Sequence, residues 1–150
     1  MKTILMVGDV QLTSGWKDII DLEGKGTFNV RLASNVQQAL KYLNESHDSD
    51  IQLVVEAALP TGEPKDLPKE LQGVDVFQLG SAFIRHVRDK GLIPSSSPAY
   101  LMNWSEIKHA PEELKGITKD VHMEDMISTI VGIVNPSHHR EDKRRMGKEA

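Results

Sequence analysis

Polar residues follow four of the apolar stretches in this chain, and their types suggest a ligand site. Asp9 follows the first stretch after Gly8, Glu56 follows the third, Asn103 the fourth and Lys119 the fifth. If these stretches are parallel strands, their carboxyl ends meet at one edge of the sheet, where such sheets bind ligands. Two carboxylates, an amide and an ammonium would then converge. Such a group can hold Mg²⁺ or a phosphoryl group.

The elements that must position these residues alternate between strand and helix patterns. Short apolar runs predict strands at 4–7, 28–32, 51–55, 99–102 and 117–118. Helical spacing of apolar residues predicts helices at 16–22 (capped by Ser14), from Ser34 or Asn35 to 43, at 74–90, weakly at 105–114, and at 123–134. Five β–α units in a row predict an α/β protein, a doubly wound five-stranded parallel sheet with helices on both faces.

Composition excludes several classes of function. The chain has 150 residues, the usual size of one domain, and its lack of cysteine excludes disulfides, zinc–thiolate sites and thiol nucleophiles. No apolar run reaches the ~18 residues of a membrane span, so a membrane partner is not expected and a cytoplasmic location is. The net charge of −4 provides no basic field for nucleic acid. Glycine-rich phosphate loops and nucleophile-elbow motifs are missing, which argues against an enzyme.

Charge and turn residues divide the chain into a domain at 1–135 and a basic tail at 136–150 that we expect to be disordered. Residues 140–150 contain five Lys/Arg and three Asp/Glu. The tail is interpreted either as a frayed terminus or as a short arm that docks on an acidic partner or nucleic acid. Residues 60–73 contain three prolines and two glycines and predict a long extended loop after the third strand.

Several of these motifs, in this order, resemble the receiver domain of response regulators. They are Ile4-Leu5-Met6-Val7-Gly8-Asp9, the run from Asp50 to Pro60, Phe83-Ile84-Arg85, the run from Pro98 to Trp104, and Thr118-Lys119-Asp120. The resemblance covers residues 1–134. It implies a flavodoxin-like, CheY-like (βα)5 fold with strand order 2-1-3-4-5, a shortened fourth helix and a longer loop after the third strand.

The chain departs from the family at the phosphoryl site itself. The acidic pair reads Gly8-Asp9, and the phospho-acceptor position carries Glu56 in place of aspartate. Asn103 stands where the family has Thr or Ser, and the aromatic switch position falls on Gly116. Lys119 matches the family's lysine and is expected to form an ion pair with Glu56. The resemblance therefore implies a degenerate pseudo-receiver.

The function implied is a stand-alone, atypical receiver-like signalling module that acts by phosphorylation-independent protein–protein interaction, without catalysis or a cofactor. Another signalling protein is the expected partner, with Trp104 as a partner contact; family analogy also allows a homodimer. The alternative is a divergent two-component response regulator that still binds weak Mg²⁺ through Asp9 and Glu56 and is phosphorylated or otherwise switched. A third interpretation makes Asp9 and Glu56 two solvated carboxylates without a role.

Overall fold

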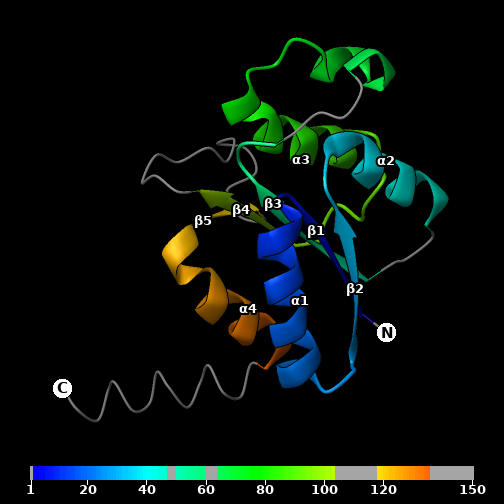
Figure 1. Cartoon of the computed structure of the whole chain (residues 1–150). Helices are drawn as coiled ribbons and strands as arrows, with labels where there is room; N and C mark the ends of the chain where they lie inside the picture. The colour runs from blue at the N-terminus through cyan, green and yellow to red at the C-terminus, as the bar shows by residue number, and fades with distance from the viewer. Residues whose placement is uncertain (1, 47–49, 60–63, 104–117, 136–150) are drawn as a thin grey trace.

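A single parallel sheet forms the centre of the molecule. The computed structural model describes residues 2–46, 50–59, 64–103 and 118–135. Its strands are β1 (Lys2–Val7), β2 (Phe28–Ala33), β3 (Ile51–Glu56), β4 (Ala99–Asn103) and β5 (Thr118–His122). All neighbouring strands run parallel, in the order β2-β1-β3-β4-β5 (Figure 1), which confirms the predicted doubly wound fold and strand order.

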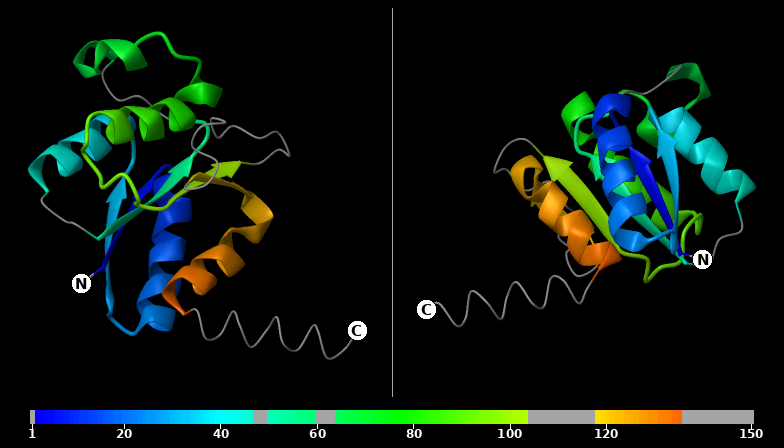
Figure 2. Two further views of the ribbon diagram at one scale, coloured as in Figure 1. Left: turned by 180° about the vertical axis from the view of Figure 1, so that it is seen from behind. Right: turned by 60° about the horizontal axis from the view of Figure 1, so that its bottom comes forward.

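Helices cover both faces of the sheet. The helices α1 (Val10–Gly24) and α4 (Met126–Val134) pack on one face, and α2 (Val36–Glu45) and α3 (Leu79–Asp89) on the other (Figures 1 and 2). The side chains of β1 alternate between the two layers: Ile4 and Met6 pack towards α1 and α4, and Leu5 and Val7 towards α2 and α3. Burial on both faces explains why β1 is apolar from Ile4 to Val7.

The strand register brings three of the predicted site residues to the carboxyl edge. Glu56 is the last residue of β3 and pairs with Met102, and Asn103 ends β4. Asp9 follows β1 after one residue, so it reaches the same edge. The sequence pattern thus located this edge of the sheet correctly.

The fifth strand differs from the prediction. We expected a short strand at 117–118 with Lys119 directly after it, but β5 continues to His122. Lys119 is the second residue of β5 and pairs with Tyr100, whereas His122 pairs with Asn103 at the carboxyl edge. β5 lies at the edge of the sheet, and Val121 is the one apolar residue in Thr118–His122, so the sequence has no apolar run there to detect.

Three helical boundaries also differ. The first helix begins at Val10 and not near Trp16, because Asp9 caps it. The third begins at Leu79, after the 3₁₀ turn η3 (Val76–Gln78). The last is divided into a 3₁₀ turn, η5 (Met123–Asp125), and α4.

The described part of the predicted extended loop is structured. It contains two 3₁₀ turns, η1 (Pro64–Asp66) and η2 (Lys69–Leu71), and its Leu67 and Leu71 side chains are buried in the core beside α3. Glu70 contacts the buried His86 of α3, with 2.8 Å between Oε1 and Nδ1. The apolar spacing of Leu67 and Leu71 is what the loop prediction overlooked.

Some predictions fall outside the described residues: the helix at 105–114, the switch position Gly116, the partner contact Trp104 and the tail at 136–150. In the part of the chain that is described, the helices are all too short or too polar to cross a membrane.

Candidate functional site

Asp9 acts first as a helix cap. Its Oδ1 accepts hydrogen bonds from the backbone N–H groups of Gln11 (2.8 Å) and Leu12 (3.4 Å) at the start of α1. These N–H groups have no partner within the helix, so a carboxylate in the capping position stabilises it. The carboxylate predicted to serve a metal or phosphoryl group is therefore engaged by α1.

Removing this cap is expected to lower the stability of the protein because hydrogen bonds are lost, and not because the negative charge of Asp9 is lost. Asp9→Ala should cost about 1 kcal/mol of unfolding free energy in urea melts. Asp9→Asn keeps a side-chain oxygen that can accept the same bonds, and it should remain within ~0.5 kcal/mol of the parent. If the asparagine variant loses as much stability as the alanine variant, the negative charge and not the cap is what matters.

Glu56 occupies the space that a side chain at position 8 would need. Its Oε1 accepts a hydrogen bond from the backbone N–H of Asp9 at 3.1 Å. A Cβ atom built on Gly8 would lie 2.6, 2.7 and 2.8 Å from the Cδ, Cγ and Oε1 atoms of Glu56. The carboxylate of β3 thus packs directly on the backbone that follows β1, across 47 positions of sequence. Glycine at position 8 is what makes this contact sterically allowed.

The environment of Glu56 favours its protonated form. Partial burial raises the pKa of the Glu56 carboxyl above its ordinary value of 4.5; the N–H of Asp9 opposes this, and the negative charge of Asp9 adds to it. Because the folded state binds this proton more tightly than the unfolded state, the contribution of Glu56 to stability is greatest below pH 4.5. That contribution declines as the pH rises through the folded pKa.

This pH dependence can be isolated by substitution. We expect the stability of the parent relative to Glu56→Gln to decrease as the pH rises from below 4.5 through the folded pKa, because glutamine does not titrate. Urea melts across this range, with the side-chain carboxyl carbon followed by NMR, provide the measurement. A relative stability that increases with pH would contradict the direction of the shift.

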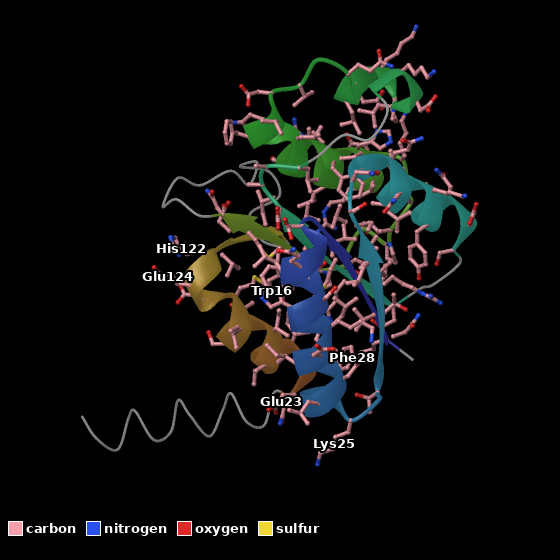
Figure 3. All side chains as sticks on the ribbon, viewed as in Figure 1. Trp16, Glu23, Lys25, Phe28, His122 and Glu124 are labelled. Atoms are coloured by element: carbon pink, nitrogen blue, oxygen red, sulfur yellow. The ribbon has the colours of Figure 1, made fainter. Side chains whose placement is uncertain are left out.

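The outer strands place Asn103 and His122 at the same edge. These residues pair at the ends of β4 and β5, and the His122 Nδ1 accepts a hydrogen bond of 3.2 Å from the backbone N–H of Glu124 (Figure 3). Lys119 lies three residues before this end, and its side chain is outside the described set. The ion pair between Glu56 and Lys119 therefore stays a prediction. Reasoning from sequence missed His122, because the residues before it in β5 include one apolar residue, Val121, and do not form a recognisable strand pattern.

Gly80 is a second glycine that shapes the site. Its N–H donates to the carbonyl of Ala57 at 3.0 Å, at the point where α3 begins beside the end of β3. A Cβ atom at position 80 would collide with the backbone carbonyl of Glu56 and lie 2.9 Å from the Cα of Ala57. The close approach fixes the backbone that carries Glu56. A glycine near the start of an amphipathic helix was the available sequence signal.

The oxygen atoms of Asp9 and Glu56 are poorly suited to hold a Mg²⁺ ion at this edge of the sheet. Gly8 supplies no side-chain oxygen, one Asp9 oxygen caps α1, and one Glu56 oxygen accepts from the Asp9 backbone. Within residues 2–46, 50–59, 64–103 and 118–135, no three acidic or histidine side chains are grouped to hold a metal ion. Magnesium needs near-octahedral oxygen ligation, so the remaining oxygens of two engaged carboxylates offer little of it.

Comparison with solved structures finds proteins of similar fold. The receiver domain of Francisella response regulator 1452 aligns over 89% of this chain and 96% of its own, with 14% identity and a TM-score of 0.55. A response-regulator receiver domain from Clostridium thermocellum (92% and 98% coverage, 12% identity) and the receiver domain of a Pseudomonas fluorescens Pf-5 HD-domain protein (93% and 98%, 12%) each give a TM-score of 0.60.

Sequence comparisons find no counterpart: no family model matches, and no curated protein matches. Identities of 12–14% establish similarity of architecture and not shared chemistry. The chain has the fold of a response-regulator receiver domain, with Glu56 packed on Gly8 at the carboxyl edge of the sheet.

Proposed function

We propose that this protein is a receiver-like signalling module whose phosphoryl site is filled by its own Glu56 side chain. We further propose that it works by binding another protein in a single conformational state. One observation carries the proposal: the Glu56 carboxylate lies on the backbone of Gly8 and accepts the N–H of Asp9. The side chain at the acceptor position thereby fills the space beside β1. A phosphoryl group would have to displace it.

A phosphorylation switch requires two states with different contacts. The contacts of Glu56 provide only one such state: its carboxyl group is held beside the backbone of Gly8 and Asp9, near the place where a phosphorylated acceptor would lie. Glutamate is one methylene longer than the family's aspartate, and this length lets its carboxylate reach over Gly8. The glycine at position 8 and the glutamate at position 56 thus fit each other sterically. This pairing favours a module with one conformational state over a receiver that is still switched by phosphorylation.

The described surface supplies apolar contacts for a protein partner. Phe77, next to the half-exposed Val76 on η3, is 65% exposed, and Ile127 on α4 is 56% exposed. Single exposed apolar residues are common, but Val76 and Phe77 are adjacent, and the Val76 carbonyl accepts a hydrogen bond of 3.3 Å from the N–H of Leu59, three residues after Glu56. A protein that binds at the carboxyl edge of the sheet would contact Val76 and Phe77.

The test is chemical phosphorylation of the intact chain. Incubation with acetyl phosphate and Mg²⁺, followed by intact-mass measurement, should leave the parent chain unmodified. The double variant Gly8→Asp with Glu56→Asp restores the family's acidic pair and acceptor, and it is expected to gain one phosphoryl group. Glu56→Asp alone is the control for the acceptor without the pair. A phosphoryl group on the parent chain would favour the alternative, a divergent response regulator that is still switched.

A further inference from the structure

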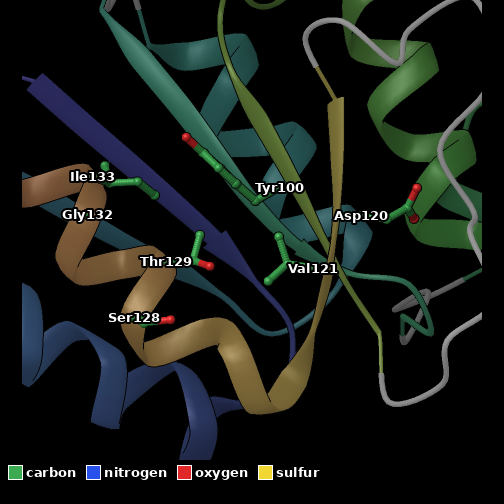
Figure 4. Close-up of a pocket in the computed structure, with 7 residues that line it drawn as sticks. All are labelled: Tyr100, Asp120, Val121, Ser128, Thr129, Gly132 and Ile133. Carbon is green, nitrogen blue, oxygen red and sulfur yellow. The ribbon is translucent and has the colours of Figure 1, made fainter. Parts of the chain in front are cut away.

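The two edge strands of the sheet differ in how they are protected against pairing. β5 has Lys119 and Asp120 among its five residues, and the Asp120 carboxylate lies on the side of β5 away from α4 (Figure 4). Charged residues commonly keep an edge strand from joining another sheet. β2 is the other edge, and its six residues, Phe-Asn-Val-Arg-Leu-Ala, include no proline, no glycine and one charged residue, Arg31. β2 is therefore the less protected of the two edges.

The backbone of β2 presents hydrogen-bonding groups to the outside of the sheet at alternate residues. The Ala33 carbonyl accepts a hydrogen bond of 3.0 Å from the N–H of Gly8, so the backbone groups of Ala33 point to β1. The direction alternates along a strand, and the register of β2 with β1 is unbroken. The N–H and C=O groups of Phe28, Val30 and Leu32 thus point outward, where no strand of the described chain pairs with them.

The side chains of β2 divide between the two faces of the sheet. Phe28, Val30 and Leu32 are partly buried against the core layer of α1 and α4. Arg31 lies on the opposite face, where its guanidinium carbon is 5.9 Å from the centre of the Tyr42 ring of α2. The one charge of the strand is thus directed at a ring of its own chain. A further apolar strand beside β2 would cover the exposed part of the three apolar side chains.

The sequence of β2 is complementary to itself in an antiparallel pair centred on Val30. In this register Val30 faces Val30 of a second copy, and Phe28 faces Leu32. These residues have the outward backbone groups, so they form the hydrogen-bonded pairs of the ladder. On the other face Asn29 lies opposite Arg31, and an amide oxygen can accept from a guanidinium. A shift that made Arg31 the centre would place two like charges opposite each other, which is destabilising.

We propose that two copies of this chain associate through β2, in an antiparallel pair centred on Val30 that joins their sheets into one continuous sheet. A contact made by one strand from each copy is small, so the dimer forms reversibly, with a dissociation constant of about 10 µM. The pairing uses none of the interactions of Glu56. The module thereby gains a partner, a second copy of itself, whatever the state of the phosphoryl site.

Sedimentation equilibrium of the full chain measures the association. We expect the mass to rise from that of one chain, 16.7 kDa, towards twice that value between about 1 and 200 µM. Hydrogen exchange followed by NMR locates the contact. The amides of Phe28, Val30 and Leu32 should become protected as the concentration rises, whereas those of Asn29 and Arg31, which point to β1, should be protected throughout. A chain that stays monomeric at ~1 mM would overturn the proposal. So would a dimer whose outward amides exchange as in the monomer.

Substitutions at Asn29 test the register by the sign of their effect. Asn29→Asp places a carboxylate opposite Arg31 of the second copy, at two symmetric positions, and should tighten the dimer about tenfold. Asn29→Lys places like charges there and should weaken it about tenfold. The double variant Asn29→Lys with Arg31→Glu puts opposite charges face to face again and should recover the dimer. Failure of this recovery would show that the two residues are not opposite each other, and the proposed register would be wrong.

Gln78→Glu and Gln78→Lys are the matched controls. They change the net charge by the same amounts as the two Asn29 variants, at an exposed position on η3 outside β2. Both should leave the dissociation constant within about twofold of the parent. Val30→Pro removes an outward N–H, and an edge strand tolerates proline at such a position. This variant should be a folded monomer. Asn29 variants that behave like the Gln78 variants, or a folded Val30→Pro variant that dimerises as the parent does, would overturn the proposal.

Discussion

Gly80→Ala is expected to destabilise the domain by about 3 kcal/mol, the upper part of the range for overpacked positions. The added methyl group would meet the backbone carbonyl of Glu56 and the Cα of Ala57, and neither is the end of a flexible side chain. Helix α3 would have to move away from β3, and the hydrogen bond from Gly80 to Ala57 would lengthen. Urea melts measure the loss, and amide shifts at Glu56 and Ala57 report the movement.

Gly15→Ala is the matched control for this substitution. Gly15 lies within α1, is exposed, and has no atom within 4 Å of an added Cβ. Alanine there should stabilise the protein by ~0.5–1 kcal/mol, since glycine is a poor helix former. The two substitutions are chemically identical and are expected to change stability in opposite directions. A Gly80→Ala variant as stable as Gly15→Ala would mean that β3 and α3 are not in close contact at this point.

Gly8→Ala is expected to cost about 2 kcal/mol, because its methyl group and the Glu56 carboxylate cannot share the same space. The carboxylate would be displaced and would lose the N–H of Asp9. In a Glu56→Ala background the collision is removed, so the same glycine substitution should cost markedly less. The difference between the two costs, the coupling energy of a double-mutant cycle, should be about 1–2 kcal/mol.

The cycle separates the collision from the backbone cost at Gly8. Its φ of +158° is unfavourable for alanine in either background, so this contribution cancels in the coupling energy. The Asp9 cap of α1 is present in all four proteins and cancels as well. A coupling energy near zero would show that Glu56 does not depend on glycine at position 8, and the closed site would lose its structural basis.

The sheet and two of the site residues could be predicted because they follow from local pattern. Residues 4–7 and 51–55 are continuous apolar runs, which indicate buried parallel strands, and the polar residues after them were placed at the carboxyl edge. Alternation of strands with helices determined the fold class. Glu56 and Asp9 are therefore close in the structure for the reason anticipated.

The parts that could not be predicted depend on tertiary context. The contact between Glu56 and Gly8 joins residues 48 positions apart, and no local pattern reports it. Lys119 was assigned to the strand end because β5 lacks an apolar run, and only pairing with β4 shows that the strand ends at His122. From the sequence, Asp9 was expected to bind a metal ion or a phosphoryl group. In the structure its carboxylate accepts hydrogen bonds from the first N–H groups of α1.

The most direct test of a closed phosphoryl site is an amide NMR titration of the intact chain with Mg²⁺, followed by beryllium fluoride. The amides to follow are those of Asp9, Glu56 and Asn103 at the sheet edge, together with α4. We predict no saturable shifts at millimolar metal and none on adding beryllium fluoride, because Glu56 already occupies the space beside Gly8. Edge residues that shift together, with α4 moving as they do, would show that the domain is still a switch and contradict the account.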